Sequence, residues 1–157
     1  MVNIVTATQR HIEGVAHLFD LYRQFYECDP DLELATRFIA TRIRNNESTI
    51  FLAEREDSSA MGFVQLYPSF CSVEAVKILI LHDLFVESSF RRLGIGEALM
   101  KRATAHAREC GALRIDLLTA KTNEPGQALY ERLGYQKVLR DFFAYSLQVS
   151  AAGAGPR

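Results

Sequence analysis

Apolar residues in the first part of the chain recur with helical spacing in two segments. Residues 2–6 predict a short strand ahead of them, and Thr8 is a suitable N-cap for the first helix. Asp29, Pro30 and Asp31 break the chain between the two helices. The predicted buried faces consist of Ile12, Val15, Ala16, Phe19, Tyr22 and Tyr26 in the first helix and of Ala35, Phe38, Ile39 and Ile43 in the second.

Three strand-like runs follow, at residues 49–55, 61–67 and 76–86, and a polar turn joins the first two. This order predicts an antiparallel meander. The third run is too continuously apolar for a strand with one wet face, so we expect it near the centre of the sheet. Its polar residues, His82 and Asp83, are therefore conspicuous. Because successive strand residues point to opposite faces, we expect the two on opposite faces of the sheet.

The second half of the chain predicts a parallel crossover unit. A helix with one apolar face begins near Gly94 and stops at Gly111, and it connects the central strand to a further buried strand. The elements predicted after Gly111 are a strand at 113–119, a helix at 125–133, and strands at 135–138 and 142–147. The fold class is therefore α/β (α+β), with a mixed central sheet of about seven strands.

The 157-residue chain has the length of one domain, and no repeat or linker divides it. We expect a single domain over residues 1–149 and a small, Gly/Ala-rich, mobile tail over residues 150–157. The formal net charge of -1 gives no overall attraction for nucleic acid or for acidic membranes. Neither is therefore an expected partner, and any basic site must be local.

The cysteines and the N-terminus bear on metals and location. Cys28, Cys71 and Cys110 lack the close pairs that zinc sites and redox motifs need, so we expect reduced thiols and no metal. The start of the chain has no basic leader with an apolar core, and no run approaches the roughly 20 apolar residues that span a bilayer. These features predict a cytoplasmic protein.

A glycine-rich turn leads from the central strand into the next helix. Gly94 and Gly96 let the backbone approach an anion closely, and the N–H groups of the first helical turn point toward it. The helix dipole adds attraction, so a pyrophosphate fits this turn. Glycines also serve tight turns for structural reasons alone. The segment lacks the third glycine of a dinucleotide fingerprint and the Gly-Lys-Ser/Thr of a nucleotide loop, which disfavours hydride and phosphoryl transfer.

Two motifs together resemble one family. Arg91-x-x-Gly94-x-Gly96 is similar to the acyl-CoA-binding signature of the GNAT superfamily of N-acetyltransferases. Asn123, seven residues before Tyr130, begins a segment similar to the later motif of that family. The resemblance covers residues 2–147. It implies the GNAT fold, with an antiparallel N-terminal meander and helices on both faces of the sheet.

The resemblance also implies a co-substrate and the residues that hold it. Acetyl-CoA would bind with its pantetheine arm along the central strand, its pyrophosphate at the glycine-rich turn and Asn123 on the arm. The main chain of Leu84, Phe85 and Val86 would contact the pantetheine, and the amides of Leu93, Gly94, Ile95, Gly96, Glu97 and Ala98 would hold the pyrophosphate, with Arg91 or Arg92 supplying charge.

Acetyl transfer to an amine needs an unprotonated nitrogen, a stabilised oxyanion and a proton for the leaving thiolate. In this family resemblance Tyr130 stands near the thioester sulfur and can donate that proton. A backbone N–H near Phe85 or Val86 can polarise the carbonyl. Asp83 is the expected base or ammonium partner, because its segment resembles the acidic segment of diamine and polyamine acetyltransferases. His82 departs from that subgroup, which more often has a second acid there. Because neighbouring strand residues point to opposite faces, only one of His82 and Asp83 is expected to reach the acceptor.

Two further segments could belong to an acceptor site. Four acidic residues, at positions 27, 29, 31 and 33, could attract a cationic amine, although caps and turns explain them as well. Residues 67–72, expected to connect two strands, offer aromatic surface for the acceptor.

The function predicted from the sequence is transfer of acetyl from acetyl-CoA to a primary amine of a small molecule. Two alternatives stay open: acetylation of a protein or peptide at lysine or the N-terminus, and a non-catalytic acyl-CoA-binding module. Retention of Asp83, Asn123 and Tyr130 argues against the module. Nucleic-acid binding by the basic residues near Arg91 is disfavoured, because no aromatic residues interleave with them. A homodimer is expected from family habit alone.

Overall fold

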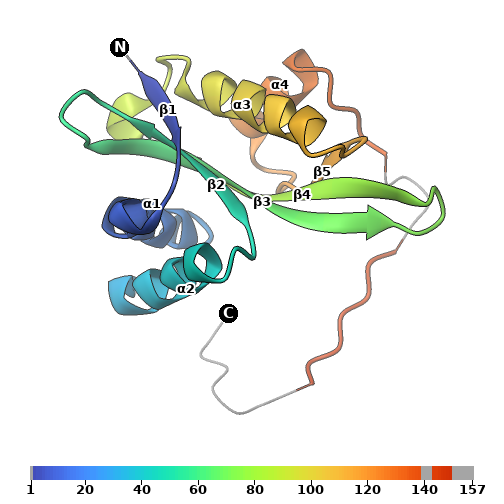
Figure 1. The fold of residues 1–157 in the computed structure, drawn as a ribbon, viewed down its shortest axis with the longest axis horizontal. Helices are drawn as coiled ribbons and strands as arrows, with labels where there is room; N and C mark the ends of the chain where they lie inside the picture. The colour runs from blue at the N-terminus through green and yellow to red at the C-terminus, as the bar shows by residue number, and fades with distance from the viewer. Residues whose placement is uncertain (1, 139–142, 150–157) are drawn as a thin grey trace. The chain divides into compact units, whose positions relative to one another are not determined.

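The computed structural model describes residues 2–138 and 143–149, and the chain forms two compact units, Met1–Leu118 and Thr119–Arg157. The first unit contains a twisted sheet with helices on both faces (Figure 1). In its described part the second unit contains one helix, α4 (Glu124–Arg132). The tail predicted at residues 150–157 lies outside the described residues.

The described part of the sheet consists of β1 (Asn3–Thr6), β2 (Thr49–Glu54), β3 (Ala60–Cys71), β4 (Val76–Val86) and β5 (Ile115–Leu117). The strands lie in sequence order. The first four pair antiparallel and β5 joins β4 in parallel, so the sheet is mixed, as predicted. β4 has a neighbouring strand on each side, and helices pack on its two faces, which explains its apolar composition.

The sheet has five strands in the described residues, not about seven. Residues 135–138 and 143–149 belong to no ladder, and residue 142, where the last strand was predicted to begin, lies outside the described part. β5 is three half-buried residues rather than the buried run predicted at 113–119. An apolar pattern marks positions that fit a sheet face, but a strand also needs a neighbouring strand to pair with, which the pattern does not reveal.

β3 continues past its predicted end at Tyr67 as far as Cys71 and pairs there with the start of β4. Residues 67–71, predicted as a connection lining the acceptor site, therefore form one arm of a long hairpin. Phe70 on this arm is 74% exposed. Pro68 and Ser69 favour a loop by propensity, but pairing with the long strand β4 overrides that preference.

Helices cover the two faces of the sheet in the first unit. α1 (Ile12–Phe25) and α2 (Leu32–Arg44) lie on one face, and α3 (Ile95–Glu109) lies on the other (Figure 1). Successive side chains of β2 point alternately to these two faces. Ile50 and Leu52 pack in the core beneath α1 and α2, whereas the Phe51 ring contacts His106 of α3, with centroids 5.4 Å apart.

The helix boundaries follow local capping signals. A short 3₁₀ turn, η1 (Gln9–His11), precedes α1, and Thr8 caps that turn rather than α1 directly. Asp31 caps α2, its carboxylate accepting from the Leu34 N–H at 2.9 Å. A second 3₁₀ turn, η2 (Ser88–Phe90), follows β4. Tyr26, predicted on the buried face of the first helix, lies just past its end and is 43% exposed.

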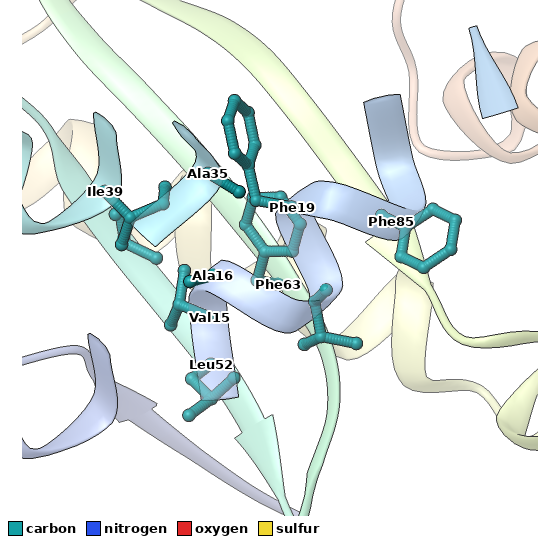
Figure 2. Packing of buried hydrophobic residues seen from close by; sticks show 10 residues of the cluster. Val15, Ala16, Phe19, Ala35, Ile39, Leu52, Phe63 and Phe85 are labelled. Carbon is teal, nitrogen blue, oxygen red and sulfur yellow. The ribbon is translucent and has the colours of Figure 1, made fainter. Parts of the chain in front are cut away.

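The core beneath α1 and α2 is aromatic where it meets the middle of the sheet (Figure 2). The Phe19 ring stacks on Phe38 at 5.1 Å and meets the Phe63 ring edge-on at 6.4 Å. Phe85 of β4 belongs to the same cluster. Offset and edge-on contacts of this kind fix ring positions as well as burying area. α1 is thereby held firmly over the stretch of β3 and β4 that carries the polar residues.

Candidate functional site

A β-bulge interrupts the pairing of β3 and β4 in the middle of the sheet. Gln65 lies opposite Asp83 and Leu66 lies opposite Leu81, so His82 is an extra residue on β4. A bulge leaves its extra residue without a partner in the ladder and bends the strand that carries it. The bend falls where the two conspicuous polar residues of this strand lie.

The bulge places His82 and Asp83 on the same face of the sheet. Asp83 lies opposite Gln65, and the His82 ring meets the Tyr67 ring edge-on with centroids 5.1 Å apart. Gln65 and Tyr67 are two residues apart on the regular strand β3, so both point toward the face that α1 and α2 cover. The expectation that His82 and Asp83 point to opposite faces is therefore wrong, because the extra residue breaks the alternation.

Asp83 is a buried carboxylate with polar neighbours. The residue is 7% exposed, and its Oδ2 accepts a hydrogen bond from Gln65 Nε2 at 2.6 Å. Burial raises the pKa of the carboxyl above the ordinary 3.8, while hydrogen bonds from Gln65 and Tyr22 and the charge of His82 act in the opposite direction. A carboxylate with a raised pKa takes up a proton more readily than an exposed one, as a general base must.

Other ionisable groups border this carboxylate. Burial, together with the negative charge of Asp83, raises the pKa of Tyr67 to about 12, so that its hydroxyl stays protonated at neutral pH. Arg42 of α2 pairs with Glu47 at 2.6 Å. Asp83 is thus the buried carboxylate beside the bulge on this face.

Beyond the bulge, one edge of β4 is open in the described part of the first unit. The pairing with β5 covers only Leu79–Leu81. The Glu87 N–H donates to the Met61 carbonyl at 3.0 Å, and polar groups alternate along an antiparallel strand. Phe85 therefore directs its main-chain groups toward β3, so they are not available for the predicted contact with the pantetheine arm. Leu84 and Val86 direct theirs to the open edge. An extended ligand could pair with that edge as a strand does.

The glycine-rich turn connects this edge to α3. Gly94 is the N-cap of α3 and has a φ of +78°, a left-handed conformation that favours glycine. Arg92 has a φ of +63°, which is uncommon for a residue with a Cβ. Backbone strain of this kind often marks a ligand site. Glu97 in the first turn of α3 pairs with Lys101 at 2.7 Å, which offsets its negative charge at the mouth of the turn.

The side chains of the turn point to different places. Arg91 donates from Nε to the Val86 carbonyl at 2.9 Å, and its guanidinium lies 5.6 Å from the centre of the Phe85 ring. Arg91 is thus fixed at the end of the open edge. Ile95 is 2% exposed and Leu93 is 64% exposed. The buried side chain of Ile95 leaves only its main chain for a ligand.

The second unit carries the other two predicted site residues. The Asn123 side chain accepts from the Gly126 N–H at 3.2 Å and donates to Thr119 Oγ1 at 3.0 Å, so it caps α4. The Tyr130 ring lies 6.0 Å from the Tyr135 ring. A structural role for Asn123 is therefore visible within its own unit, and the functional roles of Asn123 and Tyr130 remain predictions.

Two of the four acidic residues at positions 27–33 serve local structure. Asp31 caps α2, and Glu33 forms an ion pair with Arg37 one turn later. Among the described residues, no three histidine, cysteine or acidic side chains gather closely enough to hold a metal ion. In the same part of the chain, no helix has both the length and the apolar character needed to cross a membrane.

Comparison with known proteins identifies the family. Residues 15–135 match the acetyltransferase (GNAT) family. The chain belongs to this family. It is therefore an acyl-CoA-dependent N-acetyltransferase. The GNAT fold predicted from the two motifs is confirmed.

Similar proteins agree with this assignment over nearly the full length. The chain is 39% identical over 150 residues to an uncharacterized N-acetyltransferase, YhfO, of Bacillus subtilis, covering 96% of this chain and 99% of the relative. It is 23% identical to the thialysine N-epsilon-acetyltransferase of Caenorhabditis elegans, covering 95% and 92%. A crystal structure of a probable acetyltransferase matches with a TM-score of 0.85 and 36% identity, covering 94% and 98%.

Sequence reasoning missed Gln65, Ser48 and the bulge. Gln65 is entirely buried, and its Oε1 accepts from Ser48 Oγ at 2.7 Å. A single polar residue inside the apolar run 61–67 was the available signal for Gln65. Nothing in the pattern marks the bulge, because an inserted residue is visible only once the partner strand is known.

Proposed function

We propose that this GNAT enzyme transfers the acetyl group of acetyl-CoA directly to a primary amine of a small molecule. The observation that carries the proposal is the position of Asp83. It lies buried on β4, beside the bulge and immediately before the open edge at Leu84 and Val86. A thioester held along that edge would bring its carbonyl close to a carboxylate able to accept a proton.

The first unit supplies the proposed binding groups for acetyl-CoA. The open edge of β4 would hold the pantetheine arm through the main-chain groups of Leu84 and the N–H of Val86, because the Val86 carbonyl already accepts from Arg91. The amides of residues 93–98 would hold the pyrophosphate at the start of α3. Arg92 would supply the positive charge there, since Arg91 is already fixed on Val86.

The proposed reaction needs one proton acceptor and one proton donor. An alkylammonium has a pKa near 10 and must lose a proton before its nitrogen attacks. Asp83 would take this proton or hold the ammonium group until water does. The C–N bond then forms through a tetrahedral intermediate, the nitrogen loses its second proton to water, and the C–S bond breaks as the CoA thiolate leaves. Tyr130 would protonate that thiolate and regain a proton from water, a role that its sequence motif suggests.

The proposed acceptor class is an alkyl primary amine, which includes the side-chain amines of amino acids as well as diamines and polyamines. The relative from Caenorhabditis elegans is a thialysine N-epsilon-acetyltransferase, which supports an acceptor of this class. The surface around the bulge is compatible with a slender cationic chain, because Asp83 offers charge and the His82, Tyr67 and Tyr22 rings offer flat walls. We also propose a homodimer in the cytoplasm, as the family resemblance suggests.

Acetyl-CoA consumption measured across matched amines tests this proposal. The panel contains alkyl diamines, amino acids with side-chain amines, the corresponding alcohols and lysine-containing peptides. We expect turnover on small primary amines and none on the alcohols. Turnover confined to peptides would contradict the small-molecule acceptor and indicate a protein or peptide acceptor. CoA binding without turnover on any amine would favour the non-catalytic module.

A further inference from the structure

Gln65 is a fully buried amide in the middle of β3. It has no exposed surface, and it lies directly across the ladder from Asp83. Its Nε2 donates to Asp83 Oδ2 at 2.6 Å, and its Oε1 accepts from Ser48 Oγ at 2.7 Å. An amide buried in a sheet is destabilising unless both of its ends are satisfied. Here both ends have partners, and one partner is the proposed base.

The direction of this hydrogen-bond chain is fixed by chemistry. An amide oxygen only accepts, so the Ser48 hydroxyl must donate to it. With the oxygen turned to Ser48, the amide N–H groups face the Asp83 carboxylate. The opposite orientation would place two oxygens against each other and leave the N–H groups facing a hydroxyl. The ionised Asp83 carboxylate only accepts and therefore selects this orientation, and Ser48 holds the amide there by donating to its oxygen.

We propose that Gln65 is a positioning residue that keeps the Asp83 carboxylate ionised and oriented, with Ser48 fixing the Gln65 amide. This inference deepens the proposed function and rests on it for the role of Asp83 in turnover. A hydrogen bond to a charged oxygen stabilises the ionised form, and it is stronger in a buried site than in water. The Gln65 donor thus opposes the effect of burial on a group that must be ionised to accept a proton.

The other groups that face Asp83 set the background for this effect. Tyr22 of α1 and His82 of β4 lower the pKa of the carboxyl, through a hydrogen bond and through charge, respectively. Tyr67 of β3 faces it as a protonated phenol, and Arg42 of α2 lies beyond Tyr67. Burial remains the largest influence on the pKa of Asp83 and raises it. Removal of the Gln65 donor leaves less to oppose burial, so the pKa of Asp83 must rise further.

The test measures the Asp83 carboxyl in the full chain by carbon NMR as a function of pH. Gln65→Met keeps the length and apolar stem of the side chain and deletes the donor. We expect it to raise the pH midpoint of the Asp83 titration by about one to two units, as expected for loss of one hydrogen bond to a charged group. Ser48→Ala, which leaves Gln65 in place, should move the midpoint in the same direction by less.

Gln24 provides the matched control. Its Nε2 donates to the carboxylate of Asp20 at 3.0 Å, so Gln24→Met removes the same kind of contact elsewhere in the same unit. This variant should leave the Asp83 titration unchanged. The acidic limb of the pH profile of kcat/KM should shift to higher pH together with the NMR midpoint in Gln65→Met and Ser48→Ala. It should not shift in Gln24→Met.

The outcomes separate this inference from the proposed function. An unchanged Asp83 midpoint in Ser48→Ala and in Gln65→Met would overturn the role of Gln65, whatever the enzyme acetylates. A raised midpoint in a protein that acetylates no amine would contradict the proposed function and leave the electrostatic role of Gln65 standing. Should Gln65→Met fail to fold, the Ser48→Ala titration alone decides.

Discussion

The chemistry of the site is concentrated in Asp83, because it is a carboxylate in a place where carboxylates are rare. Burial opposes its charge, and the sheet offers it a donor from Gln65 at 2.6 Å. Such opposing influences are typical of groups whose proton affinity serves a reaction. A structural role would need only a neutral residue of the same shape, since apolar groups are tolerated at this depth without a partner.

Asp83→Asn should lower kcat for amines by about 100-fold or more, because an amide cannot take up the proton that the ammonium loses. The dissociation constant for CoA, measured by calorimetry, should stay within about twofold, since the proposed CoA contacts lie on Leu84, Val86 and the turn. Asp57→Asn, at the exposed β2–β3 turn, is the control and should be fully active. Full activity of Asp83→Asn at neutral pH would remove Asp83 from the mechanism.

Tyr130→Phe should reduce turnover toward the lower end of the roughly 100- to 10,000-fold range of general acid catalysis. A CoA thiol is already a fair leaving group, which limits the effect. Phenylalanine keeps the ring contact with Tyr135 and deletes only the hydroxyl, so the melting temperature and CoA affinity should change little. Turnover within about twofold of wild type, at saturating amine and with chemistry rate-limiting, would make Tyr130 a packing residue.

At the scale of elements, the strand-turn-helix segment from β4 to α3 combines the two proposed halves of the cofactor site. The open edge ends at Val86, Arg91 binds the carbonyl of that residue, and the strained Arg92 precedes the N-cap of α3. A non-glycine residue in the left-handed region costs about 1–2 kcal/mol. Strain of this kind directly before a helix N-terminus is consistent with the proposed ligand contact.

Arg92→Gly should therefore weaken CoA binding without weakening the fold. Glycine relaxes the positive φ, so the free energy of unfolding should stay the same or rise by up to ~1 kcal/mol. The dissociation constant for CoA should rise about tenfold through loss of the charge. Asn46→Gly relaxes a similar φ of +52° far from the turn and is the control for backbone effects. Unchanged CoA affinity in a folded Arg92→Gly variant would place the pyrophosphate elsewhere.

The sequence predicted this segment well and the bulge beside it poorly, for a physical reason. A glycine turn and a helix cap are local, so Gly94 and the start of α3 can be predicted from neighbouring residues. The bulge at His82 depends on the register between β3 and β4, which involves residues far apart in the sequence. The predicted face of Asp83 relative to His82 was therefore wrong, although both residues were recognised as conspicuous.

The remaining errors in the sheet have the same origin. Both ends of the strand Val76–Val86 were predicted correctly, because a long apolar run bounded by turn residues fits a buried strand. Residues 67–71 were assigned to a connection, because Pro68 and Ser69 disfavour strands locally while their pairing with β4 favours one. Gln65 appeared as one polar residue in an apolar run, and its meaning depended on Asp83 and Ser48, its partners in space.

At the scale of the whole molecule, the site should reduce the stability of the fold at neutral pH. The folded-state pKa of Asp83 lies above its ordinary value of 3.8, because burial disfavours the charge. Between these two pKa values the folded state binds more protons than the unfolded state, so stability falls as pH rises through that window. At pH values above the folded-state pKa, the full loss in the free energy of unfolding is present. The ionised carboxylate that the reaction uses therefore destabilises the protein that holds it.

Asp83→Asn should accordingly give an inactive protein that is more stable than wild type at pH 7. Asparagine is neutral, and its carbonyl can still accept from Gln65, so it resembles the protonated aspartate. The gain in the free energy of unfolding, measured by urea denaturation, should shrink as pH falls toward about 3.8. Asp57 provides a contrast of opposite sign, because hydrogen bonds from Ser59 lower its pKa and Asp57→Asn should lose stability at pH 7. A loss of stability in Asp83→Asn at pH 7 would show that the carboxylate serves the fold, and would remove the main argument for assigning it to catalysis.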